Sequence, residues 1–284
     1  MKSRTLFPVL CLLLVACLAR AAVPAGFQFH FIEYPGSTST HLYAVSNNDI
    51  GVGLYFDSSG VQHGFMVKNG KFQTVDDPNG VGSTVFSGVN SNGTAVGYYV
   101  DGSGFFHGIS YSNGVFTDVG PAGSPDTLAD GINDAGIIVG AFSDTDGIEK
   151  GFVFDGTNYQ TVYVSGSEYT LLYAINASGV STADWANTGG NPEASIYNGS
   201  TFTTINVPGA VASYASGIDS SGDVVLTWSD SSGATHGAGL IGGRYTKFNA
   251  PGCVDTYADG INDQHVVVGV CQKTSGYSGF YVIY

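Results

Sequence analysis

The sequence "LADGINDAGIIVG" at residues 128–140 returns as "YADGINDQHVVVG" at residues 257–269. More divergent copies lie between and before them. When the chain is aligned on the apolar residue before each polar turn, six anchors appear, spaced by 44, 43, 43, 43 and 43 residues: Val45, Val89, Ile132, Ile175, Ile218 and Ile261. A repeat of this length decides the fold, so it has to be interpreted before any single motif.

Each repeat contains four strand-like segments separated by the same kinds of turn. A polar turn such as "NDAG" (133–136) follows the first segment. The second segment, for example "IIVGAF" (137–142), is apolar without alternation, which is typical of a strand covered on both faces. A "DSSG"-type turn precedes the third segment, and a turn such as Asn113-Gly114 precedes the fourth. Four strands in about 43 residues predict one blade of a β-propeller.

The fourth segments show how the repeats are joined. They begin with an aromatic residue in five repeats: Phe72, Phe116, Tyr159, Phe202 and Tyr245. The sixth repeat lacks this segment, but Phe29 lies 43 residues before Phe72 in an opening stretch that has no first three segments. The sequence therefore predicts an all-β, six-bladed β-propeller in which the N-terminal strand completes the last blade. An open array or a sandwich is the alternative.

These repeats resemble the bacterial HAF-type extracellular repeat family, whose pattern runs G-I-N, a short turn, V-V-G and then H-[AG]-F. The clearest copies lie at 88–109, 131–152 and 260–280, and the unit at 174–195 departs most. The resemblance covers essentially all of the predicted mature chain. It implies secretion and a repeat fold, and it carries over no catalytic residue.

The N-terminus has the pattern of a secretory signal. Lys2 and Arg4 precede an apolar stretch that is too short for a comfortable membrane span, and an A-x-A cleavage site ends at Ala21. We therefore expect a signal peptide at 1–21 and a single propeller at 27–284, in a secreted, extracellular or periplasmic protein. The rival interpretation is a lipobox at Cys17, which would make an outer-surface lipoprotein with a lipid anchor. No later segment is long and apolar enough to span a membrane.

The charge balance excludes some partners. The chain has 23 acidic and 9 basic residues and a net charge of −14, which becomes −17 when the three basic residues of the signal are removed. Nothing would neutralise phosphates, so nucleic acid and anionic membranes are poor partners. We expect a monomer.

The residue two positions before each anchor is the most informative. Around the ring the series is Tyr-Ser-Asp, twice over: Tyr43, Ser87, Asp130, Tyr173, Ser216 and Asp259. If these side chains reach the mouth of the central channel, they would form a small polar site for a sugar or a cation. The alternative is that they pack or form hydrogen bonds between blades.

Three further groups are candidates for special roles. In the "DTDG" turn, Asp144 and Asp146 place carboxylates at alternate positions, as calcium loops do, although Asx-turn bonding also explains them. We expect no other cofactor. Cys253 and Cys271 would form a disulfide in an oxidising compartment, or else remain two buried thiols. His63, His107 and His236 lie in separate blades, too far apart to share a metal, so they predict structural bonding.

No nucleophile elbow, zinc-protease motif or P-loop is present in the sequence. We therefore expect a binding scaffold for a carbohydrate or cell-envelope ligand. Its site should lie on the face of the "DSSG" turns and the long loops between blades. A purely structural extracellular protein is one alternative. The other alternative is a glycoside hydrolase or lyase that uses Asp130 and Asp259. It is less favoured because paired acids must lie roughly 5–10 Å apart, and opposite walls of the channel would exceed that separation.

Overall fold

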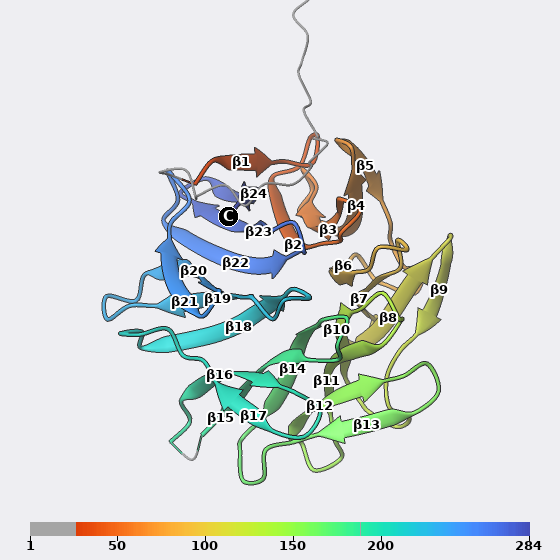
Figure 1. The fold of residues 1–284 in the computed structure, drawn as a ribbon. Helices are drawn as coiled ribbons and strands as arrows, with labels where there is room; N and C mark the ends of the chain where they lie inside the picture. Colours follow the sequence, from red (N-terminus) through yellow and green to blue (C-terminus); the bar gives the residue numbers. More distant parts are fainter. Residues whose placement is uncertain (1–26, 188) are drawn as a thin grey trace, which may run out of the picture.

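The protein is a six-bladed β-propeller. In the computed structural model, which describes residues 27–187 and 189–284, the chain forms 24 strands and no helix within those ranges. The strands form six four-stranded antiparallel sheets arranged around one axis (Figure 1). The described residues include no helix long and apolar enough to cross a membrane. The predicted signal peptide and Cys17 lie outside the described residues.

The six blades follow one another along the chain. Blade 1 contains β2 (Ser39–Val45), β3 (Ile50–Phe56), β4 (Gln62–Lys68) and β5 (Lys71–Thr74), and blade 2 contains β6 (Thr84–Val89), β7 (Ala95–Val100), β8 (Phe106–Ser112) and β9 (Val115–Asp118). Blade 3 contains β10 (Thr127–Ile132), β11 (Ile138–Ser143), β12 (Glu149–Phe154) and β13 (Tyr159–Val162), and blade 4 contains β14 (Thr170–Ile175), β15 (Ser181–Ala186), β16 (Pro192–Tyr197) and β17 (Phe202–Thr204). Blade 5 contains β18 (Ala212–Ile218), β19 (Val224–Ser229), β20 (Thr235–Ile241) and β21 (Arg244–Phe248). Blade 6 contains β22 (Asp255–Ile261), β23 (Val266–Lys273), β24 (Gly276–Ile283) and β1 (Phe29–Ile32).

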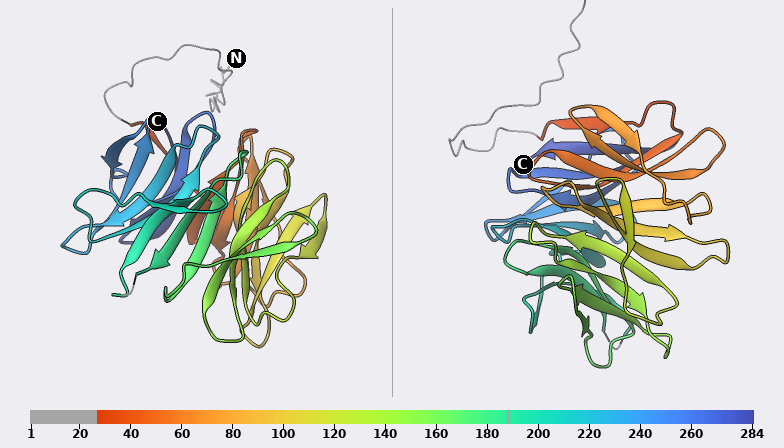
Figure 2. Two further views of the ribbon diagram at one scale, coloured as in Figure 1. Left: turned by 60° about the horizontal axis from the view of Figure 1, so that its bottom comes forward. Right: turned by 90° about the vertical axis from the view of Figure 1, so that its right-hand side faces the viewer.

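The ring is closed as the sequence predicts. Strand β1 pairs antiparallel with β24, with Phe29 opposite Val282 and Ile32 opposite Gly279. The start and the end of the described chain therefore lie in one sheet, where the red strand runs beside the blue ones in Figures 1 and 2. Because this pairing supplies the fourth strand of blade 6, all six blades have four strands.

The innermost strand of every blade carries a β-bulge. Its ladder with the second strand skips a position, for example between Leu42 and Ala44 in blade 1 and between Ala258 and Gly260 in blade 6. In five blades the irregularity falls at the residue two before the anchor, and in blade 4 it spans that residue, Tyr173, and Ala174. A bulge redirects the side chain of the extra residue. The side chains at the Tyr-Ser-Asp positions therefore point in a different direction from the one that a regular strand would give them.

The small residue after each bulge is explained by crowding at the axis. A Cβ atom added to Gly88 would lie 2.7 Å from the carbonyl oxygen of Asp130 in the next blade, and one added to Gly260 would lie 2.9 Å from that of Tyr43. Real side chains essentially never make such contacts, so Gly88 and Gly260 cannot be replaced without a shift of the neighbouring innermost strand. Blades 1 and 4 accommodate a methyl group at the equivalent position, in Ala44 and Ala174.

The apolar core lies between the blades. One buried cluster combines Val52 and Val75 of blade 1 with Phe86, Val89 and Ile109 of blade 2. Similar clusters occupy the other junctions. The unalternating apolar second strands are thus covered on both sides, as their sequence predicts.

Candidate functional site

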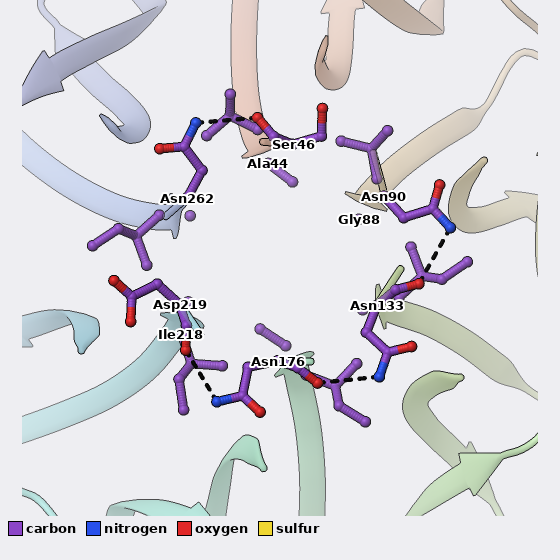
Figure 3. A pocket seen from close by; sticks show the side chains of 18 of the residues that line it. Ala44, Ser46, Gly88, Asn90, Asn133, Asn176, Ile218, Asp219 and Asn262 are labelled. Carbon is purple, nitrogen blue, oxygen red and sulfur yellow. Dashed lines mark hydrogen bonds between the residues drawn. The ribbon is translucent and has the colours of Figure 1, made fainter. Parts of the chain in front are cut away.

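A cavity of about 120 Å³ lies on the propeller axis. It is lined by the second halves of the innermost strands and by the turns that follow them. Figure 3 shows these residues surrounding the central opening. None of the described residues in the turns between the second and third strands of the blades lines this cavity. The face that we expected to carry the site is therefore wrong for this cavity, because its lining residues come from the ends of the innermost strands and the turns that follow them, at the opposite end of the axis.

The rim of the cavity carries an asparagine side chain in four of the six blades, and each links its blade to the next. Each Nδ2 donates a hydrogen bond to the backbone carbonyl of the equivalent residue in the next blade, at 3.0–3.2 Å: Asn90 to Asn133, Asn133 to Asn176, Asn176 to Asp219, and Asn262 to Ser46 (Figure 3). The Oδ1 atoms accept backbone N–H groups of their own turns. The sequence predicts this turn bonding but not the bonds between blades. Both amide atoms are occupied, so the rim is rigid.

The six Tyr-Ser-Asp residues form the deeper part of the cavity. All six line it, and each precedes its rim residue by three positions, which places it roughly 10 Å further in. Burial raises the pKa of Tyr43 in blade 1, and the charge of Asp259 in blade 6 adds to this rise. Burial also raises the pKa of Tyr173 in blade 4, and the charges of Asp184 in β15 and then of Asp130 in blade 3 add to it. The doubled sequence pattern thus becomes two Tyr–Asp neighbourhoods on opposite sides of the axis.

The acids in this ring are shifted towards their neutral forms. Burial raises the pKa of Asp130 to about 7 and that of Asp259 to about 8. Burial, followed by the charge of Asp259, also raises the pKa of Tyr43. Oδ2 of Asp259 has no accessible surface and no hydrogen-bond partner. Near neutral pH a protonated carboxyl group can both donate and accept a hydrogen bond, which suits recognition of a hydroxyl.

A third buried acid, Asp184 in β15, is absent from our sequence-based candidates. It is fully buried, and its Oδ1 accepts the backbone N–H of Ala215 in the next blade at 3.1 Å. Burial raises its pKa to about 8, and the bonds from Ala215 and Tyr173 oppose this rise. The equivalent Thr227 accepts the N–H of Ala258 at 3.0 Å, so this position supports the bulge of the next blade. The only signal in the sequence is a lone acid within a buried second strand.

In the turn predicted to bind calcium, both aspartates form ion pairs with Lys150. The ammonium Nζ of Lys150 lies 2.6 Å from Oδ2 of Asp144 and 2.8 Å from Oδ2 of Asp146. A calcium ion at this turn would have to displace Lys150.

The structure joins Cys253 to Cys271 by a disulfide, with their Cα atoms 5.4 Å apart. It links the loop before β22 to β23, inside blade 6.

The three histidines of the third strands do not come together. Each pairs instead with the aspartate of its own turn, as His107 does with Asp101 at 3.0 Å and His236 with Asp230 at 3.1 Å. His63 lies 2.8 Å from Asp76 and 3.7 Å from Asp57. This is the structural bonding that the sequence predicts.

A second cavity, of about 200 Å³, lies at the junction of blades 6 and 1. Its polar lining includes Ser278, whose Oγ donates to Oε1 of Glu33 at 2.8 Å, and Lys273, whose Nζ lies 3.4 Å from the same oxygen. These side chains already satisfy one another.

No protein-family model matches this chain, and no curated protein is similar to it in sequence. The similarities are to solved structures. The SapL1 lectin in complex with α-methyl fucoside is 15% identical, with 84% of this chain and 89% of that chain covered and a TM-score of 0.54. The AofleA protein of Arthrobotrys oligospora is 10% identical, with 90% and 82% covered and a TM-score of 0.51. This chain shares its fold with these proteins. At such low identity the likeness extends no further than the fold.

Proposed function

We propose that this protein is a secreted or surface-anchored scaffold that binds a carbohydrate in its central cavity. The observation that carries the proposal is the ring of six polar side chains that the bulges place around one small cavity: Tyr43, Ser87, Asp130, Tyr173, Ser216 and Asp259. The resemblance to HAF-type repeats and the N-terminal signal support export from the cell.

The size of the cavity limits the ligand. Sites for drug-sized molecules have volumes of about 300–1,000 Å³, whereas this one has about 120 Å³. A single sugar residue, or the end of a glycan chain, is a better match than a large cofactor. The rigid asparagine rim would admit such a group without opening.

The chemistry of the ring suits a polyol. Hydroxyls of Tyr and Ser and the carboxyl of Asp130 supply both donors and acceptors, which a sugar needs for its hydroxyl groups. Because the pKa of Asp130 is near 7, its carboxyl can take either role at neutral pH. The lectin in complex with α-methyl fucoside shares the fold and supports testing this class of ligand first.

The test is binding of the mature protein to a glycan array, followed by calorimetry with each sugar that binds, starting from α-methyl fucoside. We expect saturable binding that falls at least tenfold in Asp130→Asn and in Tyr173→Phe. Asp130 is preferred to Asp259 as a probe because Oδ2 of Asp259 is shielded. The matched control is Asp118→Asn, which changes an exposed acid on the outermost strand β9.

Absence of binding to every glycan would reject the proposal and favour the purely structural role. Binding that survives in both cavity variants would place the sugar elsewhere on the propeller.

A glycoside hydrolase or lyase is the second candidate, and one observation favours it. Two carboxyl groups with pKa values of about 7 and 8 line the same cavity, as a general acid requires. Burial, not repulsion between the two carboxyl groups, causes both rises, so they do not form a close catalytic pair. Release of product from fluorogenic glycosides by the wild type, lost in Asp130→Asn, would favour the enzyme over the scaffold.

A further inference from the structure

Three ligand-type side chains meet at the junction of blades 5 and 6, on the rim face of the propeller. Asp219 and Asp223 come from the turn between β18 and β19, and His265 comes from the turn between β22 and β23. Nε2 of His265 lies 3.4 Å from Oδ2 of Asp219 and 3.3 Å from Oδ2 of Asp223. Among residues 27–187 and 189–284, this is the one group of three such side chains whose ligand atoms all lie within 4.8 Å of one another.

In both aspartates, Oδ2 faces the histidine, and hydrogen bonds to Oδ1 fix the orientation of the carboxylate. Oδ1 of Asp219 accepts the backbone N–H groups of Ser221 and Asp223, both at 2.9 Å. Oδ1 of Asp223 accepts the N–H of Gly242 at 2.8 Å. Both Oδ2 atoms are thereby fixed in a direction that faces the imidazole. Bonds of this kind orient the ligands of metal sites.

The deepest of these atoms lacks a hydrogen bond. The side chain of Asp219 is 1% exposed, and its Oδ2 has no hydrogen-bond partner. Asparagines at the same position donate to the next blade, but Asp219 has no N–H to give to Asn262. An acid here interrupts the bonds between blades and leaves a buried carboxylate oxygen without a donor, which a positive group would satisfy.

All three residues depart from the repeat. Where blade 5 has Asp219, the other blades have amide or hydroxyl residues: Ser46, Asn90, Asn133, Asn176 and Asn262. Where blade 5 has Asp223, the others have β-branched residues: Ile50, Thr94, Ile137, Val180 and Val266. Where blade 6 has His265, four blades have glycine and blade 1 has Asp49.

The histidine also adopts an unfavourable backbone conformation. His265 has a φ of 57°, in the left-handed region that the glycines of the other turns occupy without strain. Strained residues are retained where something compensates for them. Three separate departures from a six-fold pattern therefore converge on one point in space.

We propose that Asp219, Asp223 and His265 bind a divalent transition-metal ion, with zinc the best match. Zinc takes imidazole nitrogen and carboxylate oxygen at about 2.0–2.2 Å. Two such ligands at the tetrahedral angle are about 3.4 Å apart, which matches the two measured separations. Calcium and magnesium prefer all-oxygen sites. Three protein ligands leave one position for water.

The proposal does not depend on sugar binding. Asp219 also lines the central cavity, so the ion would lie at its rim. The competing explanation is a metal-free ion pair, in which a protonated His265 bridges the two carboxylates.

The test uses the mature, tag-free protein, treated with a chelator and then titrated with zinc chloride alone at pH 7.5. We expect one zinc per chain by calorimetry. At a hundredfold excess over Kd, zinc should raise the Tm by about 5–10 °C. Calcium chloride should give neither effect.

The variants restore the repeat, so they are expected to fold: Asp219→Asn, Asp223→Val and His265→Gly. Each should weaken zinc binding at least tenfold, and the metal-free Asp219→Asn protein should have a higher Tm than the metal-free wild type. His107→Ala is the matched control, because His107 faces one carboxylate, that of Asp101, and not two. This variant should bind zinc as the wild type does.

A wild type without stoichiometric zinc binding would overturn the proposal. So would variants that bind zinc as tightly as the wild type. If zinc leaves the Tm unchanged and His265→Gly alters only its pH dependence, the group is an ion pair.

Discussion

Nδ2 of Asn262 in the last blade donates a hydrogen bond to the carbonyl oxygen of Ser46 in the first, at 3.1 Å, across 216 positions of sequence. The same bond joins three other pairs of neighbouring blades. Asn262 therefore stabilises its own turn and also links two blades. Because it joins the last blade to the first, it contributes to closure of the ring.

We predict that Asn262→Asp weakens this closure. The aspartate keeps the Oδ1 acceptor for Gln264 and Val266 but loses the donor to Ser46. The carbonyl oxygen of Ser46 keeps the N–H of Asp49, but the new carboxylate oxygen faces that carbonyl without a donor. A buried acceptor without a donor costs about 1–3 kcal/mol, so the free energy of unfolding in urea should fall by about that amount. Asn48→Asp removes a similar but exposed donor and should cost less than about 0.5 kcal/mol. Equal stability of the two variants would contradict the role of the Asn262 bond.

Removal of β1 should open the ring. A chain that begins at Glu33 lacks the partner of β24 and the contact of Phe29 with the buried Phe280, whose ring centroids are 5.3 Å apart. An exposed edge and an uncovered core promote association. We expect oligomers or aggregates in size-exclusion chromatography with light scattering, whereas a chain that begins at Phe27 stays monomeric.

A circular permutant distinguishes loss of β1 from loss of chain order. The rings of Phe27 and Tyr284 are 5.2 Å apart, so a short linker from Tyr284 to Phe27 can carry β1 at the new C-terminus. This permutant should recover the monomer and cooperative unfolding. A truncated chain with the wild-type Tm would show that closure by β1 is dispensable.

The ring could be predicted from sequence because its determinants are local and repeated. The spacing of Val45 and its five counterparts fixes the number of blades, and the small residues such as Gly88 report crowding at the axis. Even the missing strand is visible, because Phe29 stands one repeat before Phe72. Each of these signals recurs at a fixed interval, so six copies reinforce one another.

The sites that were missed depend on contacts between blades. Asp184 supports Ala215 in the next blade, and Asp219 meets His265 across another junction. No interval along the chain identifies such pairs until the ring is assembled. For Asp219 and His265 the signal is a departure from the repeat, since most other blades have asparagine or glycine at these positions. The counterparts of Asp184 share no residue type, so only its charge within a buried strand marks it. Loop length could not predict the face of the cavity, because the lining residues lie in the innermost strands and in the short turns that follow them.

Reduction of the disulfide should destabilise the protein without abolishing the fold. Cys253 and Cys271 are 18 positions apart, and closing a loop of this size stabilises a protein by about 3 kcal/mol. We expect urea unfolding to show a loss of about 2–4 kcal/mol in the presence of a phosphine reductant. The double variant Cys253→Ser, Cys271→Ser should be insensitive to the reductant. Identical curves for the oxidised and reduced wild type would mean that no disulfide forms.

Stability should fall as the pH rises through neutrality. Burial raises the pKa of Asp130 to about 7 and those of Asp184 and Asp259 to about 8, from an ordinary value of 3.8. The folded state therefore holds more protons than the unfolded state between about pH 4 and 8, and the free energy of unfolding decreases with pH in that window. The contribution of these carboxyl groups to stability is complete below their pKa in the unfolded state. It is lost as the pH rises through their pKa values in the folded state. We expect the Tm to fall from pH 5 to pH 8.5.

Asparagine variants test the origin of this slope. Asp184→Asn keeps an oxygen for the N–H of Ala215 but cannot ionise, so its Tm should depend less on pH than that of the wild type. Asp259→Asn should also make the Tm depend less on pH, because burial is what raises the pKa of the Asp259 carboxyl group. Asp118→Asn, at an exposed position on β9, should leave the slope unchanged. A wild-type slope in both buried variants would mean that these carboxyls are already ionised in the folded protein. A cation or a bound ligand would then have to compensate the charge around the axis.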